Sequence, residues 1–234
     1  MKTPFAVVAL ALALVSPGGF AAENTLSAAE RSAGWQLLFD GQSFSGWRGY
    51  LKKPGTPITG WEVKDGTLHS LAKVKGEQII SEKKFNDFEL SWDWKINAGG
   101  NNGVKYLVTE QRPKSPGLEY QMIDDLRHAD GKRGPLYQTA AFYGVLPAAA
   151  DKPKRQPGQW NTSRLVVRGQ KVEHWLNGQN VLTYELGSEA VKAGIAASKF
   201  KNEVGFGEKI AGHILLTYHN DDCWYRNIKV RELR

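Results

Sequence analysis

The residue types best suited to catalysis gather in the nine-residue segment Gly-Leu-Glu-Tyr-Gln-Met-Ile-Asp-Asp that starts at residue 117. On an extended strand, Glu119 and Gln121 project to one face while Tyr120 and Met122 project to the other. Asp124 follows where that strand ends. A carboxylate on a rigid strand suits acid–base catalysis, but the same pattern is typical of a solvated strand face with aspartates capping a turn. The spacing alone leaves both interpretations open.

Glycosidases that use two carboxylates provide a comparison for this strand. One acid protonates the leaving group, and the other acts as nucleophile or base. The position that alternates with Glu119 is Gln121, an amide that can neither attack nor donate an acidic proton. The pattern therefore disfavours a two-carboxylate mechanism, unless a second acid comes from another strand.

The histidines are candidate general bases, and their spacing does not match a metal-binding motif. His174 lies in a strand that runs into a hairpin turn, and His219 ends another strand beside Asn220. Without a His-x-x-x-His or paired-cysteine pattern, we predict neither a zinc site nor a cofactor, although one divalent ion bound by His and Asp from different strands is an alternative. The absence of a Gly-x-Ser-x-Gly elbow and of a phosphate-binding glycine loop disfavours esterase and nucleotide-binding functions.

Aromatic residues are frequent, with eight Trp and eight Tyr. Their rings cover sugar faces well, and their OH and NH groups reach hydroxyls. Most should belong to the core. Tyr137, Tyr143 and Tyr106 lie nearer to expected rims and are candidates for a sugar-facing wall.

The first 22 residues read as an export signal. Lys2 precedes an uncharged apolar run over residues 5–15, a helix-breaking Pro-Gly-Gly follows, and Ala21-Ala22 offers a cleavage site. We therefore expect a periplasmic or secreted protein without a membrane anchor. Export argues against a nucleic-acid partner despite the formal net charge of +7. Cys223 is the single cysteine, so no intrachain disulfide can form.

Period-two alternation predicts an all-β fold. Residues 88–96 are the clearest case, with Phe, Leu, Trp, Trp and Ile on one face. Residues 164–168 and 171–176 flank an Arg-Gly-Gln turn and predict a hairpin. Many short strands without βαβ alternation indicate a concanavalin A-like jelly-roll β-sandwich of two antiparallel sheets.

One or two short helices complete the expected elements. Leu26–Arg31, capped by Ser27, and Ser188–Lys199 carry helical patterns. Long connections over residues 127–135 and 146–159 are expected to form functional rims. The predicted organisation is a signal peptide at 1–22, a polar lead segment at 23–32 and one jelly-roll domain at 33–234.

An ordered series of motifs resembles the 3-keto-disaccharide hydrolase family. The resemblance runs from about Gly34 to Leu233. The motifs are Trp35-Gln-Leu-Leu-Phe-Asp-Gly41, the segment starting at Gly117, Gly134-Pro-Leu-Tyr137, Gly158-Gln-Trp-Asn-Thr162, Val172-Glu-His-Trp-Leu-Asn-Gly178, Gly212-His-Ile-Leu-Leu216 and Arg226-Asn-Ile-Lys229.

The resemblance implies an exported enzyme that acts on glycosides already oxidised at C3. A base removes the acidified C2 proton, an enediolate forms and the C1 substituent leaves, by elimination or overall hydrolysis. Carried over by position, His219 or Glu119 would be the base, and Lys105 or Arg226 would stabilise the enolate. Substrate-binding roles would fall to Gln121, Asp124, Tyr137, Asn161 and His174.

This chain departs from the family pattern near its C-terminal strand. Relatives usually read Leu-Gln-Asp-His-Gly, whereas residues 216–220 here read Leu-Thr-Tyr-His-Asn, and Asn102 stands where many relatives carry Ser. The departure leaves open a non-catalytic carbohydrate-binding module on the same fold. Binding of an unoxidised disaccharide without turnover would favour the module.

Overall fold

Two antiparallel sheets form the structure of residues 23–114 and 116–233, which are the residues that the computed structural model describes. The chain order is α1 (Ala28–Ser32), β1 (Gln36–Leu37), β2 (Trp47–Gly49), β3 (Trp61–Lys64), β4 (Thr67–Ser70), β5 (Ile79–Phe85), β6 (Phe88–Ile96), β7 (Asn101–Val108), β8 (Leu118–Ile123), η1 (Gly131–Arg133), η2 (Pro135–Tyr137), β9 (Asn161–Arg168), β10 (Lys171–Leu176), β11 (Gln179–Glu185), α2 (Glu189–Ala196), β12 (Gly212–Leu216) and β13 (Cys223–Glu232).

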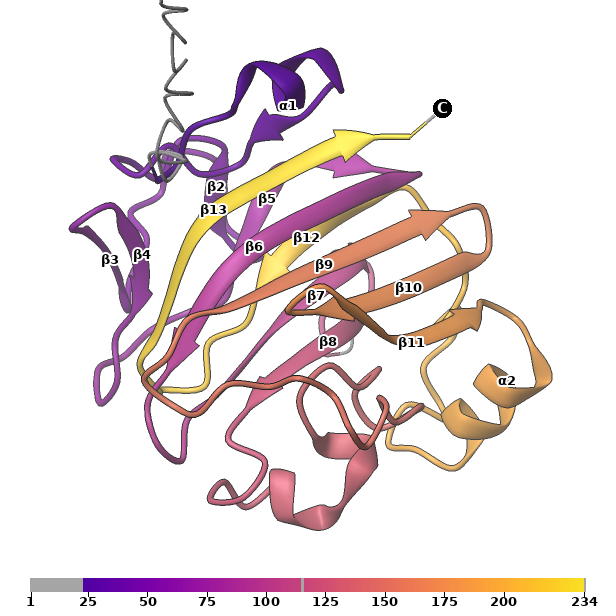
Figure 1. Cartoon of the computed structure of the whole chain (residues 1–234). Helices are drawn as coiled ribbons and strands as arrows, with labels where there is room; N and C mark the ends of the chain where they lie inside the picture. The colour runs from indigo at the N-terminus through magenta and orange to yellow at the C-terminus, as the bar shows by residue number, and fades with distance from the viewer. Residues whose placement is uncertain (1–22, 115, 234) are drawn as a thin grey trace, which may run out of the picture.

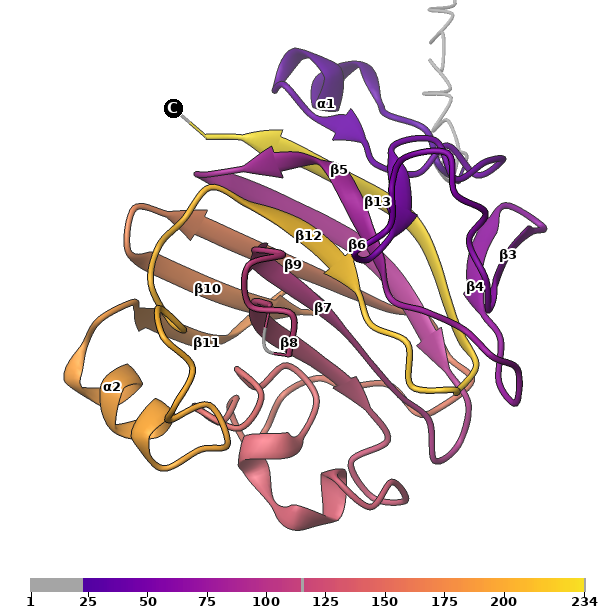
Figure 2. The ribbon, with the colours of Figure 1, turned by 180° about the vertical axis from the view of Figure 1, so that it is seen from behind.

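The larger sheet has eight strands in the order β11-β10-β9-β6-β13-β4-β3, and β1 also pairs with β13. The smaller sheet has five strands in the order β2-β5-β12-β7-β8. Figure 1 looks onto the larger sheet, and Figure 2 looks onto the smaller one from behind. The predicted all-β jelly-roll sandwich with one or two short helices is confirmed.

Alternation along β6 builds one side of the core. Phe88, Leu90, Trp92, Trp94 and Ile96 are all buried, as the sequence predicted. The Trp92 ring packs edge-on against Tyr120 of β8 with 5.1 Å between ring centroids, so the inner faces of the two sheets meet here. Truncating a tryptophan at such a position typically costs about 3–5 kcal/mol.

Local signals also place the helices and the predicted hairpin. Ser27 caps α1 in a capping box with Glu30, and Ser188 caps α2. The hairpin forms with Lys171 opposite Arg168. Both helices and the hairpin were predicted correctly.

The segment that carries η1 and η2 lies with α2 at the β8–β11 edge of the sandwich in both views (Figures 1 and 2). Within this segment, Phe142 forms a bridge with Tyr120, so the chain after β8 returns along that edge strand. The predicted signal peptide at residues 1–22 lies outside the described residues. Among the described residues, none of the helices has the length and apolar character to cross a membrane.

Candidate active site

A cavity of about 70 Å³ lies on the outer face of the smaller sheet. β7 and β8 contribute four of its side chains, and segments that follow β8, β12 and α2 supply the rest. The lining residues are Asn101, Lys105, Glu119, Gln121, Asp130, Tyr143, Lys199 and His219. Five residues that the sequence nominated therefore meet at one place, namely Lys105, Glu119, Gln121, Tyr143 and His219.

Strand register brings the charged pair of this cavity together. Lys105 of β7 lies directly opposite Glu119 of β8, with 3.6 Å between Lys105 Nζ and Glu119 Oε2. Gly103 lies opposite Gln121, and a Cβ at Gly103 would come within 2.4 Å of Glu119 Oε1. A glycine at this position therefore leaves the space that the Glu119 carboxylate occupies.

Glu119 and Gln121 share the outer face, as the alternation predicted, but they are buried rather than open to solvent. The segment after η2 covers them by pairing with the edge of β8. Ala140 N–H donates to the Gln121 carbonyl at 2.8 Å, and Tyr143 N–H donates to the Glu119 carbonyl at 3.1 Å. Covering by this segment turns a strand face into an enclosed site.

Two buried polar atoms in the cavity have no hydrogen-bond partner among the described residues. Gln121 Oε1 accepts a hydrogen bond from the Met122 backbone N–H, which fixes the amide orientation and leaves Gln121 Nε2 without an acceptor. Asn101 Oδ1 likewise lacks a donor. Because unpaired buried polar groups are costly, a bound water or the polar groups of a ligand would pair with this donor and this acceptor.

The His219 imidazole is poised to accept a proton. Within residues 23–114 and 116–233, no hydrogen bond engages either of its ring nitrogens. The His219 side chain is partly exposed to solvent, but desolvation by the neighbouring protein lowers its pKa below the usual 6.5. Lys105 and Lys199 add to this effect, whereas Glu119 and Asp221 oppose it. The ring is therefore mainly neutral at neutral pH, which is the protonation state that a general base needs.

Asp130, Tyr143 and Lys199 also line the cavity. The Tyr143 hydroxyl donates to Asp130 Oδ2 at 2.7 Å, and Arg133 donates to Asp130 Oδ1 at 2.9 Å. Burial alone would raise the pKa of Asp130, but these hydrogen bonds outweigh burial and hold the pKa below its usual value. Burial and the bond to Asp130 raise the pKa of Tyr143.

The sequence indicated only some of these three residues. Tyr143 was proposed as a wall residue, and Asp130 lies in a connection expected to form a functional rim. Lys199 was placed at the end of the predicted helix over residues 188–199 and was not nominated for the site, but α2 ends at Ala196 and Lys199 follows it. Tyr106 was also proposed as a wall residue. That prediction is wrong, because Tyr106 is fully buried in the core.

The structure places His174 in the core rather than in the cavity. His174 Nδ1–H donates to the Ala140 carbonyl at 2.8 Å, and Nε2 accepts from the Tyr106 hydroxyl at 2.9 Å. Burial lowers the pKa of His174 to about 4, so the ring is neutral. Since Ala140 is hydrogen-bonded to Gln121, His174 supports the cavity from behind.

Asp124 holds a turn and does not line the cavity. Its carboxylate accepts hydrogen bonds from the backbone N–H groups of Gly99, Leu126 and Arg127. Burial acts to raise the pKa of Asp124, but these donors and the Arg127 guanidinium lower it overall. Asp124 thereby joins the ends of β7 and β8.

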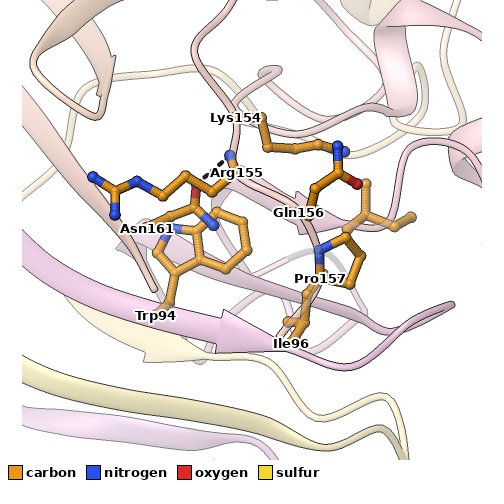
Figure 3. Close-up of a pocket in the computed structure, with 8 residues that line it drawn as sticks. Trp94, Ile96, Lys154, Arg155, Gln156, Pro157 and Asn161 are labelled. Atoms are coloured by element: carbon orange, nitrogen blue, oxygen red, sulfur yellow. Dashed lines mark hydrogen bonds between the residues drawn. The ribbon is translucent and has the colours of Figure 1, made fainter. Parts of the chain in front are cut away.

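Asn161 lies at a crevice between β6 and the connection that precedes β9 (Figure 3). Its Oδ1 accepts a hydrogen bond from Arg155 N–H at 2.9 Å, the dashed line in Figure 3, and another from Asn177 at 2.9 Å. The amide fastens this connection to the sandwich, away from the cavity. The crevice is lined by Trp94, Ile96, Ile123, Lys154, Arg155, Gln156, Pro157 and Asn161.

Arg226 and Tyr137 also lie outside the cavity. Arg226 belongs to β13 of the larger sheet, where its guanidinium pairs with Glu23 and Asp93 and stacks 4.1 Å from the Trp160 ring centroid. Of the two residues proposed to stabilise the enolate, Lys105 lines the cavity and Arg226 does not. Tyr137 lines a neighbouring cavity, and its ring meets Tyr143 edge-on at 5.5 Å.

No group of three or more His, Cys, Asp or Glu side chains in the described part of the chain is arranged to hold a metal ion.

Sequence comparison identifies the family. Residues 34–231 match the 3-keto-alpha-glucoside-1,2-lyase-like domain. A 3-keto-disaccharide hydrolase from Bacteroides thetaiotaomicron is 34% identical over 232 residues, which cover 86% of this chain and 79% of that protein. The chain belongs to this family.

Solved structures extend the comparison. A putative glycosyl hydrolase from Parabacteroides distasonis superposes with a TM-score of 0.80 at 31% identity, covering 91% of this chain and all of that one. A second putative glycosyl hydrolase from the same species gives 0.66 at 29% identity, covering 85% and 99%. A Bacillus licheniformis β-glucanase shares the fold alone, at 0.51 and 9% identity over 86% and 97% of the two chains.

The departures from the family pattern lie beside the cavity and do not line it. Thr217 Oγ1 donates to Asn102 Oδ1 at 2.9 Å between the two sheets, so two unusual residues contact each other. The Tyr218 ring packs over Gly60 and Gly76, and its hydroxyl donates to the backbone of the segment that follows β4. Both side chains are therefore engaged elsewhere in the fold and neither lines the cavity beside His219.

Proposed function

We propose that this protein cleaves glycosides whose sugar carries a ketone at C3, and that the reaction begins with removal of the C2 proton. The observation that carries the proposal is the composition of the cavity. A neutral imidazole, an ammonium group and an unpaired amide donor face one small polar space. Membership of the 3-keto-disaccharide hydrolase family supports the same chemistry.

The reaction follows from the ketone. A carbonyl at C3 acidifies the C2–H bond, so a base takes that proton and the electron pair moves onto the C3 oxygen as an enolate. The enolate then expels the C1 substituent, forming a C1=C2 double bond, while the departing oxygen takes up a proton. Addition of water across this bond gives the free 3-keto sugar, so elimination followed by hydration amounts to hydrolysis.

Each step has a candidate side chain in the cavity. We assign proton removal to His219, because its imidazole is neutral and free of hydrogen bonds to the described residues. Lys105, held beside Glu119, supplies positive charge for the enolate oxygen. Gln121 Nε2 donates to a sugar oxygen, which would satisfy an atom that is otherwise unpaired.

A two-carboxylate glycosidase mechanism fits the cavity less well. Asp130 is a second carboxylate there, which the sequence did not pair with Glu119. Such a mechanism needs one protonated carboxyl group as the acid. Both Asp130 oxygens accept hydrogen bonds that lower its pKa, and Glu119 lies beside an ammonium group. Asp130 is thus not set up to act as the acid, and Glu119 is engaged in an ion pair with Lys105.

A matched pair of substrates tests the proposal. The same disaccharide is supplied with and without oxidation at C3, and the purified protein should release the second sugar from the 3-keto form alone. His219→Gln should lower kcat/KM by about 100-fold or more, the usual weight of a general base. Binding of both forms without turnover would instead indicate a carbohydrate-binding module, and turnover of the unoxidised form would indicate an ordinary glycosidase.

Glu119 has its own control. Glu119→Gln removes the charge beside Lys105 and should reduce turnover, whereas Glu185→Gln makes the same change at an exposed position of β11 and should not. Equal activity of the two variants would contradict a role for Glu119 in the site.

We also propose that the protein works after export, because residues 1–22 have the composition of a signal peptide. Fractionation of cells that express the full chain should recover the protein in the periplasm or medium, shortened at its N-terminus. Full-length protein in the cytoplasmic fraction would contradict this proposal.

A further inference from the structure

A second and larger cavity adjoins the first. It has a volume of about 190 Å³ and shares two wall residues, Tyr143 and Lys199, with the inner cavity of about 70 Å³. Its lining residues are Arg133, Tyr137, Tyr143, Gly144, Ala197, Ser198 and Lys199. A glycoside has a reacting ring and a leaving group, and the molecule offers two neighbouring cavities of unequal size.

The lining of this outer cavity contains two cations and no carboxylate. The Arg133 guanidinium lies 3.7 Å from the Tyr137 ring centroid and gives one of its NH groups to Asp130, so further donors remain. Lys199 Nζ lies 4.6 Å from the Tyr143 ring centroid. Within residues 23–114 and 116–233, no carboxylate forms an ion pair with Lys199.

The Lys199 side chain is exposed to solvent and has no acid left to pair with among the described residues. Desolvation by the neighbouring protein lowers its pKa, and Lys105 and Arg133 add to this effect, while Glu119 and Asp130 oppose it. The two nearby acids are already engaged, Glu119 with Lys105 and Asp130 with Tyr143 and Arg133. An anion bound in the outer cavity would give Lys199 an ionic partner.

We propose that the outer cavity receives the leaving group of the substrate and selects leaving groups that carry a carboxylate, bound by Lys199 and Arg133. The inference rests on the proposed function, which places the reacting sugar ring in the inner cavity and therefore the leaving group in the outer one. The tyrosine rings would flank the body of the leaving group, while the two cations hold its acid.

Matched leaving groups test the selectivity. The substrates are the 4-carboxyphenyl and 4-carbamoylphenyl 3-keto-glucosides, which differ in charge and little in shape. A second pair, 3-keto-disaccharides ending in glucuronic acid or in glucose, distinguishes a sugar acid from an aromatic acid. We expect kcat/KM to favour the acid of at least one pair by about tenfold, as one charge-assisted hydrogen bond provides.

Substitutions locate the effect. Lys199→Gln should reduce the acid-over-amide ratio of kcat/KM to about one, and Arg133→Gln should reduce it in part. Lys192→Gln is the matched control, because Lys192 is exposed on α2 and pairs with Glu189. A ratio that is unchanged in Lys199→Gln, or that falls equally in Lys192→Gln, would overturn the inference.

A binding measurement separates this inference from the proposed function. The free leaving groups 4-hydroxybenzoate and 4-hydroxybenzamide are titrated by NMR into the wild-type protein and the Lys199→Gln variant, without any turnover. Tighter binding of the benzoate, lost in the variant, supports the acid site even if no 3-keto substrate reacts. Equal binding of the two compounds to the wild type overturns the acid site even if 3-keto substrates do react.

Discussion

Replacing Gly103 with alanine perturbs the cavity by a single methyl group. The added Cβ would lie 2.4 Å from Glu119 Oε1 and 3.1 Å from its Cδ and Cγ, whereas ordinary contacts begin at 3.4 Å. The carboxylate must therefore retreat by about 1 Å, and a misplacement of this size at a reacting centre can cost about 100-fold in rate. We expect kcat/KM for a 3-keto-disaccharide to fall by about this factor.

The stability of the Gly103→Ala variant should change little. Gly103 does not have a positive φ angle, and the clash involves the far end of a flexible side chain. The free energy of unfolding should therefore stay within about 1 kcal/mol of the wild-type value, because alanine also reduces the entropy of the unfolded chain. Urea unfolding beside the kinetic assay distinguishes a displaced carboxylate from a misfolded protein.

Gly49 of β2 provides a matched control. A Cβ there would meet Glu77 Oε2 at 2.6 Å, which is the same kind of clash with a glutamate outside the cavity. Gly49→Ala should keep its activity. In a Glu119→Gln background, Gly103→Ala should add little further loss, since the carboxylate is already gone. Full activity of Gly103→Ala, or an equal loss in Gly49→Ala, would refute the reasoning.

Three further predictions concern pH, stability and the family departure. A base works only when deprotonated and the His219 pKa is lowered, so kcat/KM should rise with pH and reach half of its plateau value below pH 6.5. This acid limb should vanish in His219→Gln, and a midpoint above 6.5 would contradict the assignment. Asp124→Asn should lower the free energy of unfolding by about 1–3 kcal/mol at pH 7. Because the Asp124 pKa is lowered by folding, this difference should persist above about pH 4 and shrink as pH falls through the folded-state pKa, and a pH-independent difference in urea titrations would count against it. Tyr218→Phe should cost about 1 kcal/mol of stability and leave kcat/KM within about twofold, whereas a large kinetic defect would place Tyr218 in the reaction.

Alternation allowed much of the fold to be predicted from the sequence. The faces of β6 and β8, the hairpin of β9 and β10, the Ser27 cap of α1 and the position of α2 follow from short-range patterns, and the structure contains all of them. Alternation along β10 could also have predicted that His174 is buried in the core. It alternates with Val172 and Leu176 on β10, and all three are buried.

The composition of the site depends on long-range pairing, which short patterns do not report. Lys105 and Arg226 both lie on strands and were equal candidates, but β7 joins the smaller sheet and β13 the larger. Asp130 reaches the cavity through an irregular segment after β8. Lys199 was predicted to end a helix, but it follows the end of α2 at Ala196, so periodicity did not report the position of either side chain. These side chains could be assigned only once the sheets were assembled.

The most direct test of the central claim is the reaction of the purified protein with a 3-keto-disaccharide in deuterated buffer, followed by NMR. Proton abstraction at C2 predicts that the released 3-keto sugar carries deuterium at C2, or that a C1=C2 unsaturated product accumulates, and that His219→Gln abolishes both signals. Release of the 3-keto sugar with its original C2 proton intact would show that the glycosidic bond breaks without deprotonation, and would contradict the mechanism proposed for His219.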